Sequence, residues 1–173
     1  MQHDMDASEW LNTPEPLRLS ALRGRVVVVS AFQMLCRGCA EHSLPQAAKL
    51  HQAFAREDLV VIGLHSVFEH HAVMTPDALR AFVHEYRLGF PIAIDRPQSH
   101  SALPATMQAW GLRGTPSLML FGRDGVLAYE HFGHLDDLRL GMVLGELLAH
   151  SAPKATAVAA AAADSPAPVC RIN

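Results

Sequence analysis

The residues of this chain best suited to chemistry are Cys36 and Cys39, which are separated by Arg37 and Gly38. A thiolate attacks disulfides, and a second thiol three residues away can resolve the mixed disulfide that forms. The Cys-x-x-Cys spacing is also half of a typical zinc site, and a free cysteine is a common core residue. A four-ligand zinc site normally needs a second Cys or His pair, whereas the one further cysteine, Cys170, lies in an Ala- and Pro-rich segment. The pair therefore predicts redox chemistry, with metal binding and a purely structural role as alternatives.

The flanking sequence predicts where this pair lies in the fold. Residues 26–29 are four consecutive valines, which indicate a buried strand. Residues 40–56 carry apolar side chains at helical spacing, and Pro45 should bend that helix. The first turn of a helix presents unpaired N–H groups and a positive dipole end, so a thiolate at Cys36 would be stabilised there. Arg37 adds a positive charge that favours the same thiolate.

The remaining apolar runs and turn signals predict an alternating α/β chain. The expected elements are a strand at 59–65 parallel to the valine strand, a helix from Thr75-Pro76 to about 88, a strand at 90–95, a short helix at 106–110, a hairpin of 118–121 with 126–132, and a last helix at 135–150. The helix between the first two strands supplies the crossover that parallel pairing requires. We therefore expect a central mixed sheet flanked by helices.

Composition sets the outer bounds. With 173 residues, 50% of them hydrophobic and 18% charged, the chain suits one globular domain, expected at 17–150. Residues 1–16 are predicted to be an irregular lead-in, followed by a short strand near 17–19, and residues 151–173 a flexible tail. A net charge of −3 argues against nucleic acid as a partner. The polar N-terminus and the lack of a long apolar run predict no membrane span and a cytoplasmic protein, or a periplasmic one if a leader was removed.

Three motifs give the chain a family resemblance. They are the segment Leu19–Val27 before the first core strand, the Cys36–Cys39 motif, and Gly114-Thr115-Pro116-Ser117 before the hairpin. With these motifs the chain resembles the thioredoxin-like redoxin family, in the branch of TlpA and ResA. It is also similar to the thioredoxin-like domain that precedes NHL repeats in larger proteins. The resemblance runs from about residue 10 to residue 150 and implies a thioredoxin fold, with an N-terminal extension and an insertion between its second and third core strands.

The same resemblance implies the arrangement of the site. In that family the proline matching Pro116 is cis and faces the cysteine pair, and the backbone of the preceding residue, here Thr115, turns toward an extended peptide docked beside the disulfide. The function implied is thiol-disulfide exchange, in which Cys36 attacks and Cys39 resolves. The partners implied are a protein or small thiol bearing a disulfide or dithiol, and a reductase or thiol donor. No cofactor, metal, nucleic acid or membrane is expected.

Two positions depart from the family pattern. Leu35 stands where relatives usually place Trp, and Ser30 stands where thioredoxins have a buried Asp and TlpA-like proteins often an Asn. A serine hydroxyl cannot accept the proton of Cys39 near neutral pH. The candidates for that proton transfer are therefore Glu69, which is the nearest match to a glutamate of ResA-like proteins, His65, and water.

Three other functions stay open at this point. A peroxiredoxin would use Cys36 against a peroxide, although Gln33 and Val29 replace the Thr/Ser and Pro of that family's motif. A Sco-like module would bind copper or zinc through both cysteines and a histidine such as His42 or His65, although the Sco cysteines are spaced one residue further apart. A redox-inactive adaptor is the third alternative. The sequence does not identify the substrate, the direction of exchange, the oligomeric state or a role for Cys170.

Overall fold

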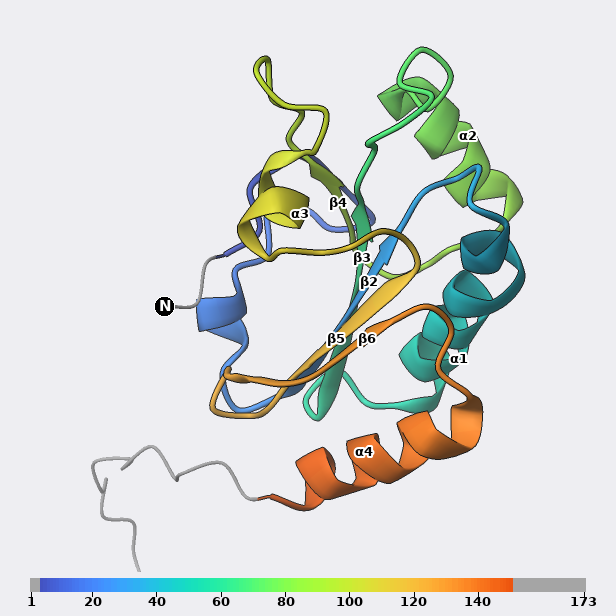
Figure 1. Cartoon of the computed structure of the whole chain (residues 1–173). Coiled ribbons are helices and arrows are strands. Elements are labelled where there is room, and N and C mark those ends of the chain that lie inside the picture. Colours follow the sequence, from blue (N-terminus) through green and yellow to red (C-terminus); the bar gives the residue numbers. More distant parts are fainter. Residues whose placement is uncertain (1–3, 151–173) are drawn as a thin grey trace, which may run out of the picture.

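A computed structural model describes residues 4–150, which form one six-stranded sheet with helices on both faces (Figure 1). The strands are β1 (Ala7–Leu11), β2 (Val26–Phe32), β3 (Leu59–His65), β4 (Ile92–Asp95), β5 (Ser117–Phe121) and β6 (Leu127–Phe132). The helices are α1 (Leu44–Ala53), α2 (Pro76–Glu85), α3 (Ala105–Ala109) and α4 (Asp137–Ala149), with a 3₁₀ turn at Leu19–Leu22 and a π-helical turn at Cys39–Ser43. The strands lie in the order β1-β4-β3-β2-β5-β6, which confirms the predicted mixed sheet.

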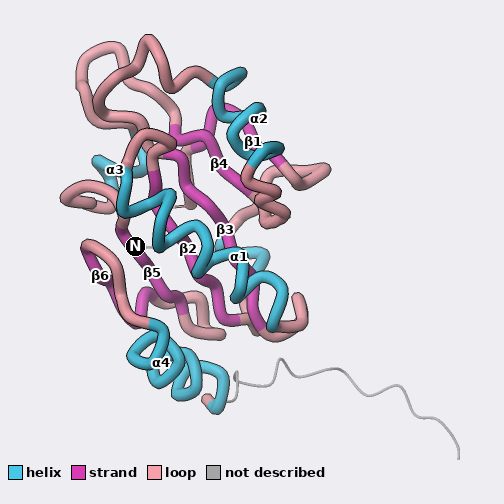
Figure 2. Tube along the Cα trace, turned by 90° about the vertical axis from the view of Figure 1, so that its right-hand side faces the viewer, coloured by secondary structure: helices cyan, strands magenta, loops and turns pink. Residues whose placement is uncertain are grey.

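The two most apolar runs of the sequence form the centre of this sheet. Strands β2 and β3 are parallel along their whole length, from the Val26–Leu59 pair to the Phe32–His65 pair, and every residue in both is buried. Because helices cover both faces of the sheet, the sequences of these two strands are continuously apolar and do not alternate with polar residues. The crossover between them contains α1, as predicted, and Figure 2 shows this helix lying across the face of β2 and β3.

The predicted hairpin lies on the other side of β2. Strand β5 runs antiparallel to both β2 and β6, and the turn closes where the Gly122 N–H donates to the Val126 carbonyl. The Asp124 carboxylate accepts from the Val126 N–H and fixes the same turn. The pairing of Ala31 with Ser117 brings the start of β5 to the carboxyl end of β2. The loop that precedes β5 is thereby placed beside the chain that leaves β2.

The expected insertion between the core strands β3 and β5 consists of α2, β4 and α3. Helix α2 begins as predicted, with the Thr75 hydroxyl accepting a hydrogen bond from the Ala78 N–H and Pro76 in the first turn. Strand β4 then pairs parallel to β3 and widens the sheet. The insertion therefore extends the sheet without interrupting its centre.

The prediction that residues 1–16 form an irregular lead-in, with a strand near 17–19, is wrong. The strand is β1, at residues 7–11, which pairs antiparallel with β4 at the edge of the sheet. The Asn12 side chain ends β1 by donating to the carbonyls of Leu88 and Phe90. The partner strand lies more than 80 residues away in sequence, so the local pattern did not reveal this pairing. The tail predicted at 151–173, with Cys170, lies outside the described residues.

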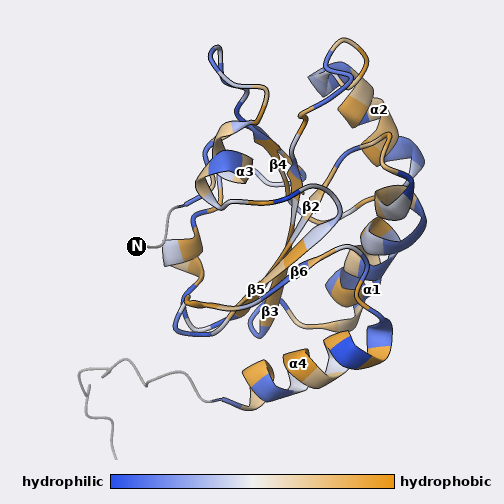
Figure 3. Cartoon of the chain, viewed as in Figure 1, coloured by the Kyte–Doolittle hydropathy of each residue, from blue (hydrophilic) through white to orange (hydrophobic). Residues whose placement is uncertain are grey.

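Two apolar cores fill the space between the sheet and its helices. One joins the sheet to α1, α2 and α4, and the other joins it to α3 and the 3₁₀ turn. Figure 1 shows how these helices lie around the sheet, and Figure 3 shows hydrophobic colouring along much of the central strands. Gly63 in β3 leaves room for two rings, since a Cβ there would lie 3.0 Å from Phe90 and 3.1 Å from Phe32. None of the helices in residues 4–150 is long and apolar enough to cross a membrane.

Candidate active site

The cysteine pair lies just beyond the carboxyl end of β2. Cys36 is half-buried, Cys39 is buried, and both are free thiols. The backbone N–H of Cys39 donates to Cys36 Sγ at 3.3 Å. A hydrogen-bond donor directed at the outer sulfur stabilises its thiolate form, so the local geometry favours Cys36 as the nucleophile.

The helix that follows differs from the single bent helix predicted for residues 40–56. A π-helical turn comes first, closed by the Leu44 N–H donating to the Cys39 carbonyl, and α1 starts only at Leu44. Pro45 follows directly on the π-helical turn, inside a helix that runs on from residue 37, so its missing N–H falls where the two kinds of helical turn meet. The expected bend is accommodated by the wider π turn, and that turn carries Cys39 into the core.

The loop before β5 faces the cysteine pair, as the resemblance implies. The Cys36 thiol donates to the Thr115 carbonyl across 3.4 Å, although the two residues are 79 positions apart in sequence. The Thr115–Pro116 peptide bond is cis, which confirms that expectation. A Cβ built on Gly38 would lie 3.4 Å from Pro116 Cδ, so Gly38 packs closely against the proline. The structure thus assembles the predicted residues from two distant segments.

The inner thiol is strongly held in its protonated form. The pKa of Cys39 is raised to about 12, chiefly by burial and then by its hydrogen bond with the Cys36 side chain, while hydrogen bonds from the Gln33 backbone and Thr115 act in the opposite direction. A thiol with this pKa carries very little thiolate near neutral pH. Resolution of a mixed disulfide at Cys36 therefore needs a group that accepts the Cys39 proton.

This difference between the thiols predicts their relative reactivity. At pH 8 we expect iodoacetamide to alkylate Cys36 at least about tenfold faster than Cys39, because a raised pKa lowers the thiolate fraction more than it raises nucleophilicity. The Cys39 rate should then rise about tenfold for each pH unit up to pH 10, since its pKa of about 12 lies above that range. Quenched time courses read by peptide mass spectrometry measure both rates. Similar rates in the folded protein would contradict the burial of Cys39, and urea-unfolded protein is the control in which the two should converge.

The family of the chain follows from its sequence together with this arrangement. Residues 4–130, which include both cysteines and Pro116, match the AhpC/TSA family. The chain belongs to the AhpC/TSA family. Its structure superposes on a thiol-disulfide isomerase from Corynebacterium glutamicum with a TM-score of 0.83 and 48% identity, covering 86% of this chain and 96% of that one.

Curated relatives place this AhpC/TSA-family chain more narrowly. It is 31% identical to human NHL repeat-containing protein 2 over a match that covers 76% of this chain. It is 26% identical to the thiol-disulfide oxidoreductase ResA of Bacillus thuringiensis over a match that covers 68% of this chain. It spans 60% of ResA, but less than a fifth of the relatives that it matches at 29–31% identity. These matches confirm the predicted thioredoxin-like redoxin family and its likeness to ResA, a protein named as a thiol-disulfide oxidoreductase.

In this AhpC/TSA-family protein the two protein candidates for proton transfer have different surroundings. His65 is buried at the carboxyl end of β3, with its ring 5.1 Å from that of Phe32, and burial lowers the pKa of its imidazole to about 4. Its Nε2 has no hydrogen-bond partner within residues 4–150, and the same holds for the buried Ser30 Oγ and Gln33 Oε1. Glu69 is exposed on the loop after β3. His65 is thus neutral and a weak proton acceptor near neutral pH, and a role for either residue stays a prediction.

Arg37 lies between the cysteines, but its side chain is exposed to solvent. Its side chain is 86% exposed and forms an ion pair with Glu41 across 2.8 Å, one turn further along the chain. An exposed pair of this kind contributes little, and the carboxylate offsets the arginine charge. The expected support of the Cys36 thiolate by Arg37 therefore stays a prediction.

The metal-binding alternative finds no assembled site in the described part of the chain. Across residues 4–150, no group of three or more His, Cys, Asp or Glu side chains is placed to hold a metal ion. His42, one of the histidines considered as a ligand, instead lies with its ring 4.9 Å from the His134 ring.

Asp95 is a buried carboxylate whose structural role the sequence analysis missed. Its carboxylate accepts hydrogen bonds from the Ser66 hydroxyl at 2.9 Å and from the backbone N–H groups of Thr106 and Met107 at 2.7 and 2.9 Å. Burial raises its pKa, against the effect of these hydrogen bonds. Asp95 thereby ties the ends of β3 and β4 to the first turn of α3. An acidic residue closing an apolar strand was the available signal in the sequence.

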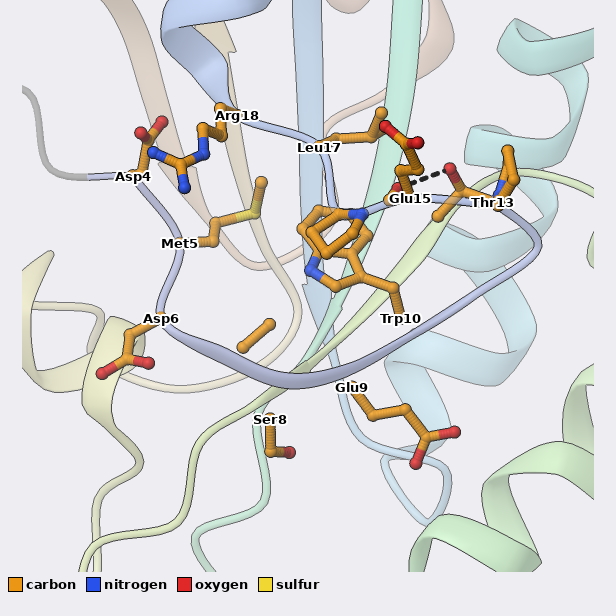
Figure 4. A pocket seen from close by; sticks show the side chains of 13 residues that line it. Asp4, Met5, Asp6, Ser8, Glu9, Trp10, Thr13, Glu15, Leu17 and Arg18 are labelled. Atoms are coloured by element: carbon orange, nitrogen blue, oxygen red, sulfur yellow. Dashed lines mark hydrogen bonds between the residues drawn. The ribbon is translucent and has the colours of Figure 1, made fainter.

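The N-terminal segment forms a separate hollow of about 490 Å³ (Figure 4). Its acidic side chains are engaged in the fold, since Asp4 accepts from the Leu19 N–H and Asp6 pairs with Arg96. None of the residues that line it is a predicted site residue. The cysteine pair therefore stays the candidate site.

Proposed function

We propose that this protein is a thiol-disulfide oxidoreductase in which Cys36 is the nucleophile and Cys39 the resolving thiol. The observation that carries the proposal is the position of Cys36 Sγ, which lies 3.3 Å from the Cys39 N–H and 3.4 Å from the Thr115 carbonyl. One contact favours the thiolate, and the other lies where an extended partner would dock beside Pro116. Support also comes from the relatives named as thiol-disulfide oxidoreductase and isomerase.

The proposed reaction has two exchange steps. The Cys36 thiolate attacks one sulfur of a partner disulfide, forming a mixed disulfide and releasing the other partner sulfur as a thiolate. Cys39 then loses its proton and attacks Cys36 Sγ, which leaves the Cys36–Cys39 disulfide and a fully reduced partner. A reductase or thiol donor returns the pair to the dithiol form. In the reverse direction the same steps oxidise a partner dithiol.

The burial of Cys39 makes the second step dependent on a proton acceptor. Ser30 lies in the buried strand before the pair and cannot accept a proton near neutral pH. We propose that a water molecule or His65 fills this role, although burial lowers the pKa of His65 to about 4 and so makes it a weak proton acceptor near neutral pH. Glu69, exposed on its loop, is the alternative.

Trapping the intermediate tests this assignment. A Cys39→Ser variant keeps the nucleophile but cannot resolve the mixed disulfide, so we expect its adducts with partner proteins to accumulate. Mass spectrometry of trapped species from a lysate would identify both the partner and the cysteine involved. Adducts through Cys36 support the proposal, whereas a Cys39→Ser variant that turns over insulin at the wild-type rate would refute the role of Cys39.

The same preparation distinguishes the peroxiredoxin alternative. If disulfides are the substrate, wild-type protein supplied with dithiothreitol should consume hydrogen peroxide no faster than the Cys36→Ser variant does. In this chain the Thr/Ser position of the peroxidase motif is filled by the buried Gln33, which lacks a hydroxyl.

The proposed reducing direction suits a cytoplasmic location, where thiols are kept reduced. Alkylation of intact cells would test it by showing the Cys36–Cys39 pair mainly as dithiol.

A further inference from the structure

We propose that Arg113 determines partner specificity by binding a carboxylate of the protein segment that docks beside Thr115 and Pro116. This inference rests on the proposed disulfide exchange and adds the chemistry of the partner. The segment recognised would carry an Asp or Glu close in sequence to its reactive cysteine.

The position of Arg113 is the first observation. It stands two residues before Thr115, whose carbonyl is the group that Cys36 Sγ contacts. On the other side of the same loop, the Gly133 N–H donates to the Pro116 carbonyl, and Phe132 pairs with Ser117 in the sheet. Arg113 and Phe132 therefore border the backbone against which a partner strand would lie.

The second observation is that the guanidinium is held in place. Its central carbon lies 5.0 Å from the centroid of the Phe132 ring. That ring in turn rests on Gly114, where an added Cβ would come within 2.9 Å of it and where φ is +159°. Gly114 thus permits the close packing of Phe132 on which Arg113 stacks. A cation already oriented on an aromatic ring loses less conformational freedom when it binds an anion.

The third observation concerns charge. Arg37, Arg80, Arg96 and Arg123 each form an ion pair with a carboxylate. Arg113 is exposed and, like Arg23, Arg87 and other arginines of residues 4–150, forms no such pair, so it is its position beside Thr115 that sets it apart. Its planar group can donate two parallel hydrogen bonds to a carboxylate. The charge is therefore available to a partner at the border of the site.

The exposed apolar surface near the cysteines agrees with this kind of partner. Leu35, directly before Cys36, is 59% exposed, and Phe132 is 42% exposed. Such side chains favour an apolar peptide segment, and Arg113 adds a preference for one negative charge on it. Arg113 acts here on binding and takes no part in the sulfur exchange.

Matched peptide disulfides test the inference. Three peptides differ at one position beside the disulfide, which holds Glu, Gln or Lys, and kcat/KM is measured for wild type, Arg113→Gln and Arg113→Lys. We expect wild type to reduce the Glu peptide about two- to fivefold faster than the Gln peptide, as for an exposed ion pair, and the Lys peptide slowest. Arg113→Gln should remove this preference while leaving the Gln peptide unchanged, and Arg113→Lys should retain part of it. High salt should weaken the preference in wild type.

Arg23→Gln is the matched control, because Arg23 is exposed and precedes β2, at the opposite end of that strand from the cysteines. It should preserve the wild-type ratios. An Arg113→Gln variant with the wild-type Glu/Gln ratio would overturn the inference, as would a uniform loss of rate on all three peptides. If wild type reduces none of the peptides, the proposed exchange itself fails. If it reduces all of them equally, only the role of Arg113 fails.

Discussion

Replacing Cys36 by serine is expected to abolish insulin reduction with dithiothreitol as donor, lowering the rate by at least about a thousandfold. A serine hydroxyl does not ionise near neutral pH, so the Cys39 N–H that now donates to the sulfur would face a neutral oxygen. No other described thiol can take over, because Cys39 is buried and its pKa is raised to about 12. The variant should remain folded, since the change replaces one atom of a half-buried side chain.

The control for this experiment is Cys170→Ser, which removes the one cysteine outside the described residues and should leave the rate unchanged. Circular dichroism and a thermal melt establish that both variants keep the fold. Full activity in Cys36→Ser would show that the nucleophile is assigned wrongly. Loss of activity in Cys170→Ser would show that the pair does not act alone.

Replacing Asp95 by alanine should lower the free energy of unfolding by about 2–4 kcal/mol. The change removes the acceptor for the Ser66 hydroxyl and for two N–H groups at the start of α3. Those donors are buried and would lose their partner without gaining water, which is the costly case. Urea unfolding at pH 7 measures the difference. Asp77→Ala, which removes an exposed carboxylate paired with Arg80, should cost less than about 1 kcal/mol.

The effect of Asp95 on stability should also depend on pH. Burial raises the pKa of its carboxyl above the ordinary 3.8, so folding favours the protonated form. The stabilisation that follows is complete below pH 3.8 and is lost as the pH rises through the folded-state pKa. Wild type should therefore gain stability relative to Asp95→Ala on going from pH 7 to pH 4. An unchanged difference, or wild-type stability in Asp95→Ala at pH 7, would contradict the buried role of this carboxylate.

The elements that could be predicted from the sequence are those fixed by local pattern. Four consecutive valines and the run Leu59–His65 are too apolar to be exposed on either face, so they could only be central strands. The Asp124-Gly125 turn predicted the hairpin, and Thr75-Pro76 predicted the start of α2, because both signals act within a few residues. The cysteine spacing and its place after a strand indicated redox chemistry, because this motif too lies within a few consecutive residues.

The tertiary structure alone decided the features that depend on residues far apart in the chain. Strand β1 exists because β4 offers a free edge, and the raised pKa of Cys39 arises from burial under elements that follow it. The bonds to Asp95 come from the ends of β3 and α3, and the stacking of Arg113 on Phe132 joins a loop to the end of β6. Local periodicity carries no information about such neighbours, because burial and hydrogen bonding there are set by the packing of the whole sheet.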